Sequence, residues 1–210
     1  MPAWRILAGV AALCGYAWLS HWLMVHAPAR PWTVAALFGP LLAAVAVAGW
    51  KRRHRPTLAS AAAAAVAVAV VVARGGVEDV SRLYVLQHAA IHAVLGWTFG
   101  MTLRPGAMPL ISLLARSVHE QFPPALADYT RWLTGLWTAY FFAMIAVSLA
   151  IYALAPWPWW SFFCNVLTPL AAVGLFAGEH VLRYWRHPEF ERITLARALR
   201  AWQAHATAAR

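Results

Sequence analysis

The amino-acid sequence predicts an all-α, polytopic membrane protein: a bundle of six transmembrane helices with both termini in the cytoplasm. Three observations lead to this fold class: the composition, the number of long apolar segments and the distribution of basic residues. Hydrophobic residues make up 62% of the 210 residues and charged residues only 11%, and the mean hydropathy is +0.60. A water-soluble domain of this length needs more polar surface than that to cover its core.

Six segments approach the length of about 20 predominantly apolar residues that a transmembrane helix requires. These predicted spans are residues 6–25, 33–50, 57–73, 83–103, 132–154 and 161–182. The third span is rich in alanine, whose small side chain lets neighbouring helices approach closely. The first span has a signal peptide as its alternative, because Ala27–Ala29 reads A-P-A, as a cleavage site does. Its apolar run exceeds the roughly 7–15 residues of a signal core, which favours an uncleaved span.

Basic residues are distributed unevenly between the two sides of the predicted bundle. With the amino terminus in the cytoplasm, all but three of the 17 Lys and Arg residues fall on the cytoplasmic side. The three exceptions are Arg30, Arg74 and Arg82. Cytoplasmic loops retain Lys and Arg during insertion, so the pattern supports an even number of spans. We expect the lipid bilayer as a partner and no nucleic acid.

Residues 1–187 form the predicted transmembrane domain, and two segments on its cytoplasmic side have helical patterns of their own. Residues 109–121 place Leu110 and Leu114 along one side, as an interfacial helix does. Residues 188–210 form a basic tail whose apolar side chains recur at helical intervals among arginines. This pattern suits a helix on anionic lipid or on an acidic partner. A solvated helix is the alternative for the tail.

The fourth predicted span carries four residues, spaced four apart, that follow one another along one face of the helix. They are His88, His92, Gly96 and Gly100. The last span repeats the G-x-x-x-G pattern at Gly174 and Gly178. In the six-span topology these two helices run in the same direction, and the two glycine pairs lie at nearly the same depth. We therefore predict that the two spans cross at the glycines with close backbone contact.

Three interpretations compete for His88 and His92. In the first, each imidazole forms a hydrogen bond with a polar group on a neighbouring helix, with Gln87, Asn165 or Ser20 as the candidates. In the second, they bind haem or a metal, for which further ligands are required, and His21 is a candidate by position. In the third, they relay protons or take part in catalysis. No set of carboxylates accompanies the histidines, and we predict neither a metal nor a resident cofactor.

A second group of polar residues lies near the cytoplasmic ends of the predicted spans. Its members are Arg116, Tyr129, Arg131, Glu179, His180 and Arg183. Glu179 and Arg183 are four residues apart, which favours an ion pair, and a carboxylate within a span is expected to be paired or to line a polar cavity. Such a group suits an anionic head group, a phosphopantetheine arm or a carboxylate as its ligand. The alternative is that these residues anchor the helix ends.

The sequence leaves open whether the protein is an enzyme. His119, Glu120 and Glu179 are the candidate acid–base residues for an enzyme that acts on a lipid or acyl substrate. No catalytic triad, phosphate-binding loop or H-E-x-x-H motif accompanies them. Both cysteines, Cys14 and Cys164, lie within predicted spans, so the sequence indicates neither a disulfide framework nor a zinc site built on cysteine.

Roughly residues 83–190 resemble an uncharacterised family of bacterial inner-membrane proteins that are often encoded with aryl-polyene or xanthomonadin-type pigment biosynthesis genes. The segments that carry the resemblance are LQHAAIHAVLGWTFGMTL, PLISLLAR, YTRWLTGLWTAYFF, WSFFCNVLTPL and FAGEHVLR. Some members carry the label ketosynthase. This chain does not fit that label, because a ketosynthase is a soluble thiolase-like enzyme with a nucleophilic cysteine.

The resemblance implies an accessory role in the membrane-associated synthesis, handling or export of a polyene lipid, beside enzymes that depend on an acyl carrier protein. The family supplies no catalytic residues to carry over. Because carrier proteins are acidic, the basic cytoplasmic face suits an acyl carrier protein or another biosynthetic protein as partner. The resemblance therefore implies a multi-pass accessory protein of the bacterial inner membrane. A membrane-embedded enzyme and a haem or metal protein that uses His88 and His92 are the alternatives.

Overall fold

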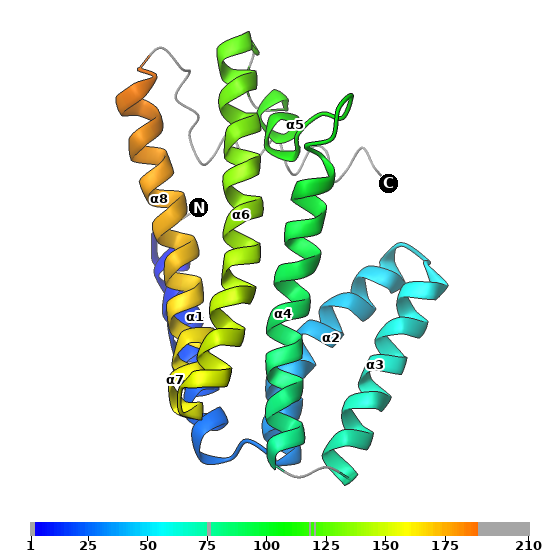
Figure 1. The fold of residues 1–210 in the computed structure, drawn as a ribbon. Helices are drawn as coiled ribbons and strands as arrows, with labels where there is room; N and C mark the ends of the chain where they lie inside the picture. The colour runs from blue at the N-terminus through cyan, green and yellow to red at the C-terminus, as the bar shows by residue number, and fades with distance from the viewer. Residues whose placement is uncertain (1–2, 75–76, 118, 120, 189–210) are drawn as a thin grey trace. The chain divides into compact units, whose positions relative to one another are not determined.

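The computed structural model describes residues 3–74, 77–117, 119 and 121–188, and every regular element among them is helical (Figure 1). In chain order the elements are α1 (Ala3–His26), α2 (Pro31–Lys51), α3 (Arg55–Arg74), α4 (Val77–Met101), α5 (Leu110–Arg116), α6 (Pro124–Leu154), α7 (Trp157–Phe162), the π-helical turn η1 (Phe163–Leu167) and α8 (Thr168–Arg186). The predicted all-α class is confirmed. The predicted basic tail lies outside the described residues from position 189 onward.

Among the described residues, five helical segments are long and apolar enough to cross a membrane, judged by length and composition. They are Leu7–His26, Pro31–Lys51, Arg55–Arg74, Pro124–Leu154 and Trp157–Arg186. Helix α4 contains most of the fourth predicted span, residues 83–103, and runs for 25 residues, but it does not belong to this set. Its polar residues Gln87, His88 and His92 lower its hydropathy. The six-span topology therefore stays a prediction.

Two boundaries differ from those that the sequence predicts. Helix α6 already begins at Pro124, well before residue 132, because proline is favourable in the first turn of a helix, where the backbone N–H has no partner. Helix α5 covers only Leu110–Arg116, which is shorter than the interfacial helix predicted over 109–121. Leu113 and Leu114 on α5 are exposed, as expected for a helix at a lipid interface.

The chain divides into two compact units. Unit 1 comprises residues 1–89 and 147–170, and unit 2 comprises residues 90–146 and 171–210. The boundaries between them fall within α4, within α6 and near the start of α8.

The core of unit 1 is a cluster of buried apolar side chains, several of them aromatic. Its members are Met24, Val34, Leu37, Phe38, Val80, Tyr84, Val85 and Trp160. The fully buried Trp160 donates its indole N–H to Ser148 Oγ at 3.0 Å. Trp157 Nε1 donates to the Met24 carbonyl at 2.7 Å, and the Tyr84 hydroxyl donates to a carbonyl of the α1–α2 loop at 2.9 Å. These bonds satisfy polar atoms that would be costly to leave unpaired in apolar surroundings.

The last long helical segment contains the widened π turn η1. Pro169 cannot donate the i→i−4 hydrogen bond to Asn165, and the helix adjusts in the turn that precedes it. The carbonyl of Phe163 accepts from both the backbone N–H and the hydroxyl of Thr168. The π turn therefore keeps its carbonyl satisfied and fixes the Thr168 side chain at the start of α8.

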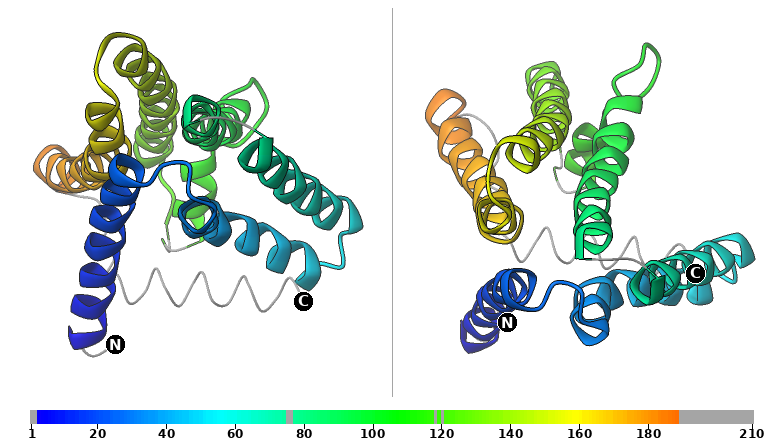
Figure 2. Two further views of the ribbon diagram at one scale, coloured as in Figure 1. Left: turned by 90° about the horizontal axis from the view of Figure 1, so that it is seen from below. Right: turned by 60° about the horizontal axis from the view of Figure 1, so that its bottom comes forward.

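Helices α2 and α3 form a hairpin that is tight at one end and open at the other (Figures 1 and 2). At the tight end, a Cβ added to Gly49 would lie 3.1 Å from Thr57 and 3.2 Å from Leu58, so glycine is needed for this approach. Arg53, in the turn, has a φ of 51°. Toward Pro31 and the end of α3, the two helices leave between them an apolar groove of about 500 Å³.

In unit 2, the short helix α5 is tied to α6 by hydroxyl groups. Ser112 and Thr130 share a buried hydrogen bond of 2.7 Å, and the backbone N–H of Ile111 donates to Thr134 Oγ1 at 3.3 Å. The backbone N–H of Leu110 donates to the hydroxyl of Thr102, which follows α4, at 3.0 Å. Helix α5 thus has fixed contacts at the end of unit 2 where α4 ends and α6 begins.

The predicted crossing of the two glycine pairs is wrong. A Cβ on Gly96 would lie 3.0 Å from the Phe142 ring, and one on Gly100 would lie 3.3 Å from Thr138, so both residues allow α4 to approach α6. Gly174 and Gly178 on α8 are exposed, and no atom lies within 4 Å of a Cβ built on either. The two glycine pairs have equal depth in the predicted topology, but depth does not determine which face of α8 is directed toward α4.

This difference predicts opposite responses to the same substitution. Gly96→Leu is expected to lower the free energy of unfolding by about 1–3 kcal/mol, because the side chain must displace Phe142 and the Cβ of Phe141. Gly174→Leu has open space around it and serves as the matched control. Unfolding of the purified variants in detergent, followed by sodium dodecyl sulfate titration, measures both effects. Equal stability of the two variants would contradict the α4–α6 contact.

Candidate functional site

Glu179 is a buried charged residue of α8, and its side chain is only 3% exposed. Arg183, one turn further along α8, donates through Nε to Glu179 Oε1 and through Nη2 to Oε2, both at 2.7 Å. Tyr129 on α6 donates its hydroxyl to Oε1, also at 2.7 Å. The predicted ion pair between Glu179 and Arg183 is confirmed, and Tyr129 joins it to a second helix of unit 2.

Aromatic rings surround the charged groups of this cluster. The Arg183 guanidinium lies 6.0 Å from the centroid of the Tyr129 ring and 5.8 Å from that of Tyr184. The ring of His187 meets Tyr129 edge-on at 5.4 Å. Cation–π and edge-on contacts of this kind hold a guanidinium in one orientation. The Glu179 carboxylate therefore has its charge balanced and both oxygens hydrogen-bonded, as a buried charge requires.

This geometry bears on the acid–base role considered for Glu179. A general base needs a carboxylate oxygen within hydrogen-bond reach of the substrate proton that it removes. In Glu179, Oε1 already accepts from Tyr129 and Arg183, and Oε2 accepts from Arg183. A bidentate guanidinium also stabilises the ionised carboxylate. The arrangement suits a structural role for Glu179, in which it joins α6 to α8, better than a role as a catalytic acid or base.

The other members of the predicted cluster have separate contacts. Arg116 is exposed, and its guanidinium lies 5.5 Å from the Phe122 ring centroid. Arg131 is exposed as well, and its Nη2 donates to the carbonyl of Leu103 at 2.8 Å. His180 is exposed and packs edge-on against a tyrosine of its own helix at 4.9 Å. Of the six predicted residues, Tyr129, Glu179 and Arg183 thus contact one another. The other three have contacts outside this cluster.

The two remaining acid–base candidates follow α5. His119 is partly buried, and its backbone N–H donates to the carbonyl of Ala115 at 3.0 Å. Glu120 lies outside the described residues.

His88 and His92 are both buried. Nε2 of His88 lies 3.4 Å from the hydroxyl oxygen of Thr168, and its ring meets the ring of Trp160 edge-on at 6.1 Å. The ring of His92 meets Phe141 of α6 edge-on at 6.1 Å. Aromatic rings thus occupy space beside both imidazoles, where a macrocycle would need room. These surroundings favour packing and hydrogen bonding over haem ligation.

His21, the third histidine considered as a ligand, has a hydroxyl partner. Its Nδ1 and Ser161 Oγ share a hydrogen bond of 2.9 Å. Asn165 donates to the Ser161 carbonyl at 2.8 Å, and Ser20 Oγ is buried with no hydrogen-bond partner among the described residues. Within the described part of the chain, no group of three or more His, Cys, Asp and Glu side chains is placed to hold a metal ion.

Sequence reasoning missed the partners of these histidines. Ser161 and Thr168 are the hydroxyl residues that contact His21 and His88, and their presence in an otherwise apolar segment was the available signal. The π turn between them changes the helical phase, so spacing alone did not place them. Sequence reasoning also missed the groove between α2 and α3. The signal for the groove is the run of alanines in α3, whose side chains are too small to fill the space beside α2.

Comparison of the chain with protein-family models, with curated proteins and with solved structures finds no match.

Proposed function

We propose that the chain is a multi-pass protein of a bacterial inner membrane and acts as an accessory component in the synthesis or handling of a polyene or acyl lipid. In this role it binds an acidic cytoplasmic protein, an acyl carrier protein, at one end of unit 2. The observation that carries the proposal is a set of exposed arginines there. Its members are Arg104, Arg116, Arg131 and Arg186, here called the arginine end.

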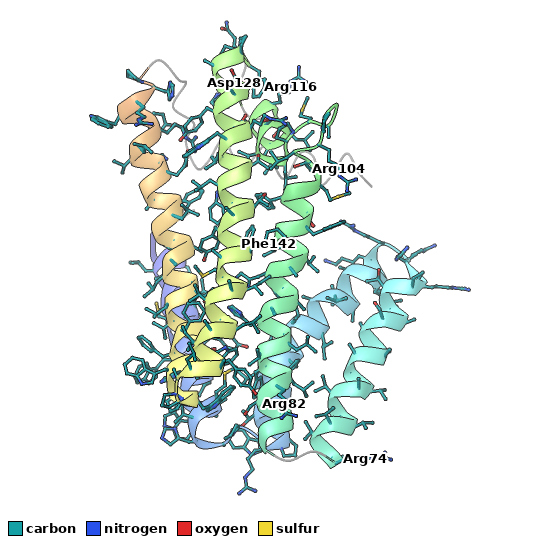
Figure 3. The ribbon with its side chains drawn as sticks, viewed as in Figure 1. Arg74, Arg82, Arg104, Arg116, Asp128 and Phe142 are labelled. Carbon is teal, nitrogen blue, oxygen red and sulfur yellow. The ribbon has the colours of Figure 1, made fainter. Side chains whose placement is uncertain are left out.

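Contacts within unit 2 bring these arginines to the same end. Arg131 donates to the Leu103 carbonyl, which joins the start of α6 to the chain beyond α4. Tyr129 joins the start of α6 to the end of α8 through Glu179. Figure 3 shows Arg104, Arg116 and Asp128 toward this end of unit 2.

The charge of the arginine end remains available to a partner. Arg183 is neutralised by Glu179, and Asp128 is the exposed carboxylate among the described residues of unit 2. Exposed basic side chains of one sign steer an acidic partner and raise its association rate. The contacts of Arg116 with Phe122 and of Arg131 with Leu103 hold two of the guanidinium groups in place.

A binding role agrees better with these contacts than a catalytic one does. Both oxygens of the buried carboxylate accept hydrogen bonds, and the exposed arginines can donate hydrogen bonds but cannot accept a proton near neutral pH. The resemblance of residues 83–190 to a family encoded beside polyene biosynthesis genes supports the same role.

Charge reversal at the arginine end tests the proposal. Arg104→Glu/Arg116→Glu is expected to weaken binding of a purified bacterial acyl carrier protein by at least about tenfold, since two attractive contacts become repulsive. The affinity of the wild type should fall as salt is raised. Biolayer interferometry on protein in lipid nanodiscs measures both effects.

The matched control is Arg52→Glu/Arg55→Glu, which reverses two exposed charges in and beside the α2–α3 turn. This variant should bind the carrier protein within about twofold of the wild type, because both residues belong to unit 1. An unchanged affinity in the arginine-end variant, or an equal loss in both variants, would refute docking at the arginine end.

A further inference from the structure

We infer that the groove between α2 and α3 is a binding site for one acyl chain of an anionic phospholipid, with the phosphate held between Arg30 and Arg74. This inference does not depend on the proposed function, because all of its residues belong to unit 1. It concerns the lipid of the membrane itself and no soluble partner.

The groove is apolar along its whole length. Pro31, Phe38 and Leu42 of α2 line one wall, and Ala65, Ala69 and Ala73 of α3 line the other. Its volume of about 500 Å³ falls within the roughly 300–1,000 Å³ typical of ligand sites. Phe38 also belongs to the buried core of unit 1, so packing fixes this part of the lining.

The length of the groove corresponds to one leaflet. From Pro31 to Leu42, a rise of 1.5 Å per residue gives roughly 16 Å, about half of the ~30 Å hydrocarbon core of a bilayer. The lining residues of α3 begin at Ala73, next to the end of that helix, and reach Ala65. A site that starts at a helix end and stops near mid-membrane fits a single acyl chain that enters from the head-group side.

Two arginines flank the open end. Arg30 directly precedes Pro31, and Arg74 directly follows Ala73, so each adjoins a lining residue at the same end of the groove. Both side chains are exposed, and neither forms an ion pair with an acidic side chain that the structure describes. Guanidinium groups bind phosphate oxygens in bidentate fashion. The pair therefore supplies charge complementarity to a phosphate whose acyl chain lies in the groove.

The same arginines are exceptions to the charge asymmetry of the sequence. Arg30, Arg74 and Arg82 are the basic residues predicted on the side where positive charge is disfavoured during insertion. Figure 3 shows Arg74 and Arg82 near the same end of α3 and α4. Binding of an anionic head group gives a physical reason for placing Arg30 and Arg74 on this side, beside an apolar groove.

Native mass spectrometry tests the site. Protein in detergent receives equal amounts of phosphatidylglycerol and phosphatidylcholine, and the lipid that stays bound is counted. The wild type is expected to retain one phosphatidylglycerol with about a tenfold preference over phosphatidylcholine. Arg30→Gln/Arg74→Gln should remove the preference, and Ala69→Trp, which fills the groove, should remove retention of both lipids.

Matched controls separate these effects from general damage. Arg52→Gln/Arg55→Gln removes two charges from the other end of the hairpin, and Ala67→Trp adds a ring to an exposed position of α3 that does not line the groove. Both should retain lipid as the wild type does. Ala65→Trp blocks the inner end of the groove and serves as a second filling variant if Ala69→Trp does not fold.

Three outcomes would overturn the inference. The first is retention of phosphatidylglycerol that neither the Arg30→Gln/Arg74→Gln variant nor the filling variants reduce. The second is equal retention of both lipids by the wild type. The third is a lipid-free wild-type dimer that Ala69→Trp converts to a monomer, which would identify a second copy of the chain as the occupant of the groove.

Discussion

Replacing Glu179 by alanine is expected to lower the free energy of unfolding by about 2–4 kcal/mol, because the Arg183 guanidinium then lies beside the Tyr129 and Tyr184 rings without its counter-charge. The loss is smaller than for a fully buried pair, since the Arg183 side chain is 22% exposed and can turn toward water. Tyr129 also loses its acceptor. Sodium dodecyl sulfate titration of the purified variant in detergent measures the change.

Two further variants establish the cause. Glu179→Leu/Arg183→Leu removes both charges and should recover much of the stability, because an apolar pair of similar volume can replace a buried ion pair at little cost. Asp128→Asn removes an exposed carboxylate of α6 and should change stability by less than about 0.5 kcal/mol. If Glu179→Ala is as stable as Asp128→Asn, the cluster does not hold α6 to α8.

Truncating Trp160 to alanine is expected to destabilise unit 1 by about 3–5 kcal/mol, the cost typical of removing a fully buried aromatic ring. The cavity removes the contacts with Trp157 and His88, and packing contacts of this kind stabilise a protein in lipid as well as in water. The Ser148 hydroxyl also loses its indole donor. The same denaturation measurement applies.

Trp159→Ala is the matched control, because Trp159 directly precedes Trp160 in the sequence and its side chain is 63% exposed. It should unfold within about 0.5 kcal/mol of the wild type. Similar losses at Trp159 and Trp160 would contradict the burial of Trp160 in the core of unit 1. Trp160→Phe keeps most of the ring and should recover part of the lost stability, which separates packing from the hydrogen bond to Ser148.

The sequence by itself determined the fold class and the positions of the long helices. A run of about 20 apolar residues with few charges favours a helix, which satisfies all of its backbone hydrogen bonds within the segment, as a membrane requires. The predicted spans accordingly coincide with helices, including α4, whose histidines lower its hydropathy without preventing helix formation. The ion pair of Glu179 and Arg183 was also predictable, because residues four apart in a helix share a face whatever the helix packs against.

Only the tertiary structure decided which faces meet. The spacing of Gly174 and Gly178 matches that of Gly96 and Gly100, yet only the latter pair lies against another helix, α6. Tyr129 as a partner of Glu179 depends in the same way on how α6 is rotated. A helical pattern fixes the residues that share a face, but the rotation of each helix follows from the side chains of its neighbours. These are far away in sequence, so local spacing carries no information about them.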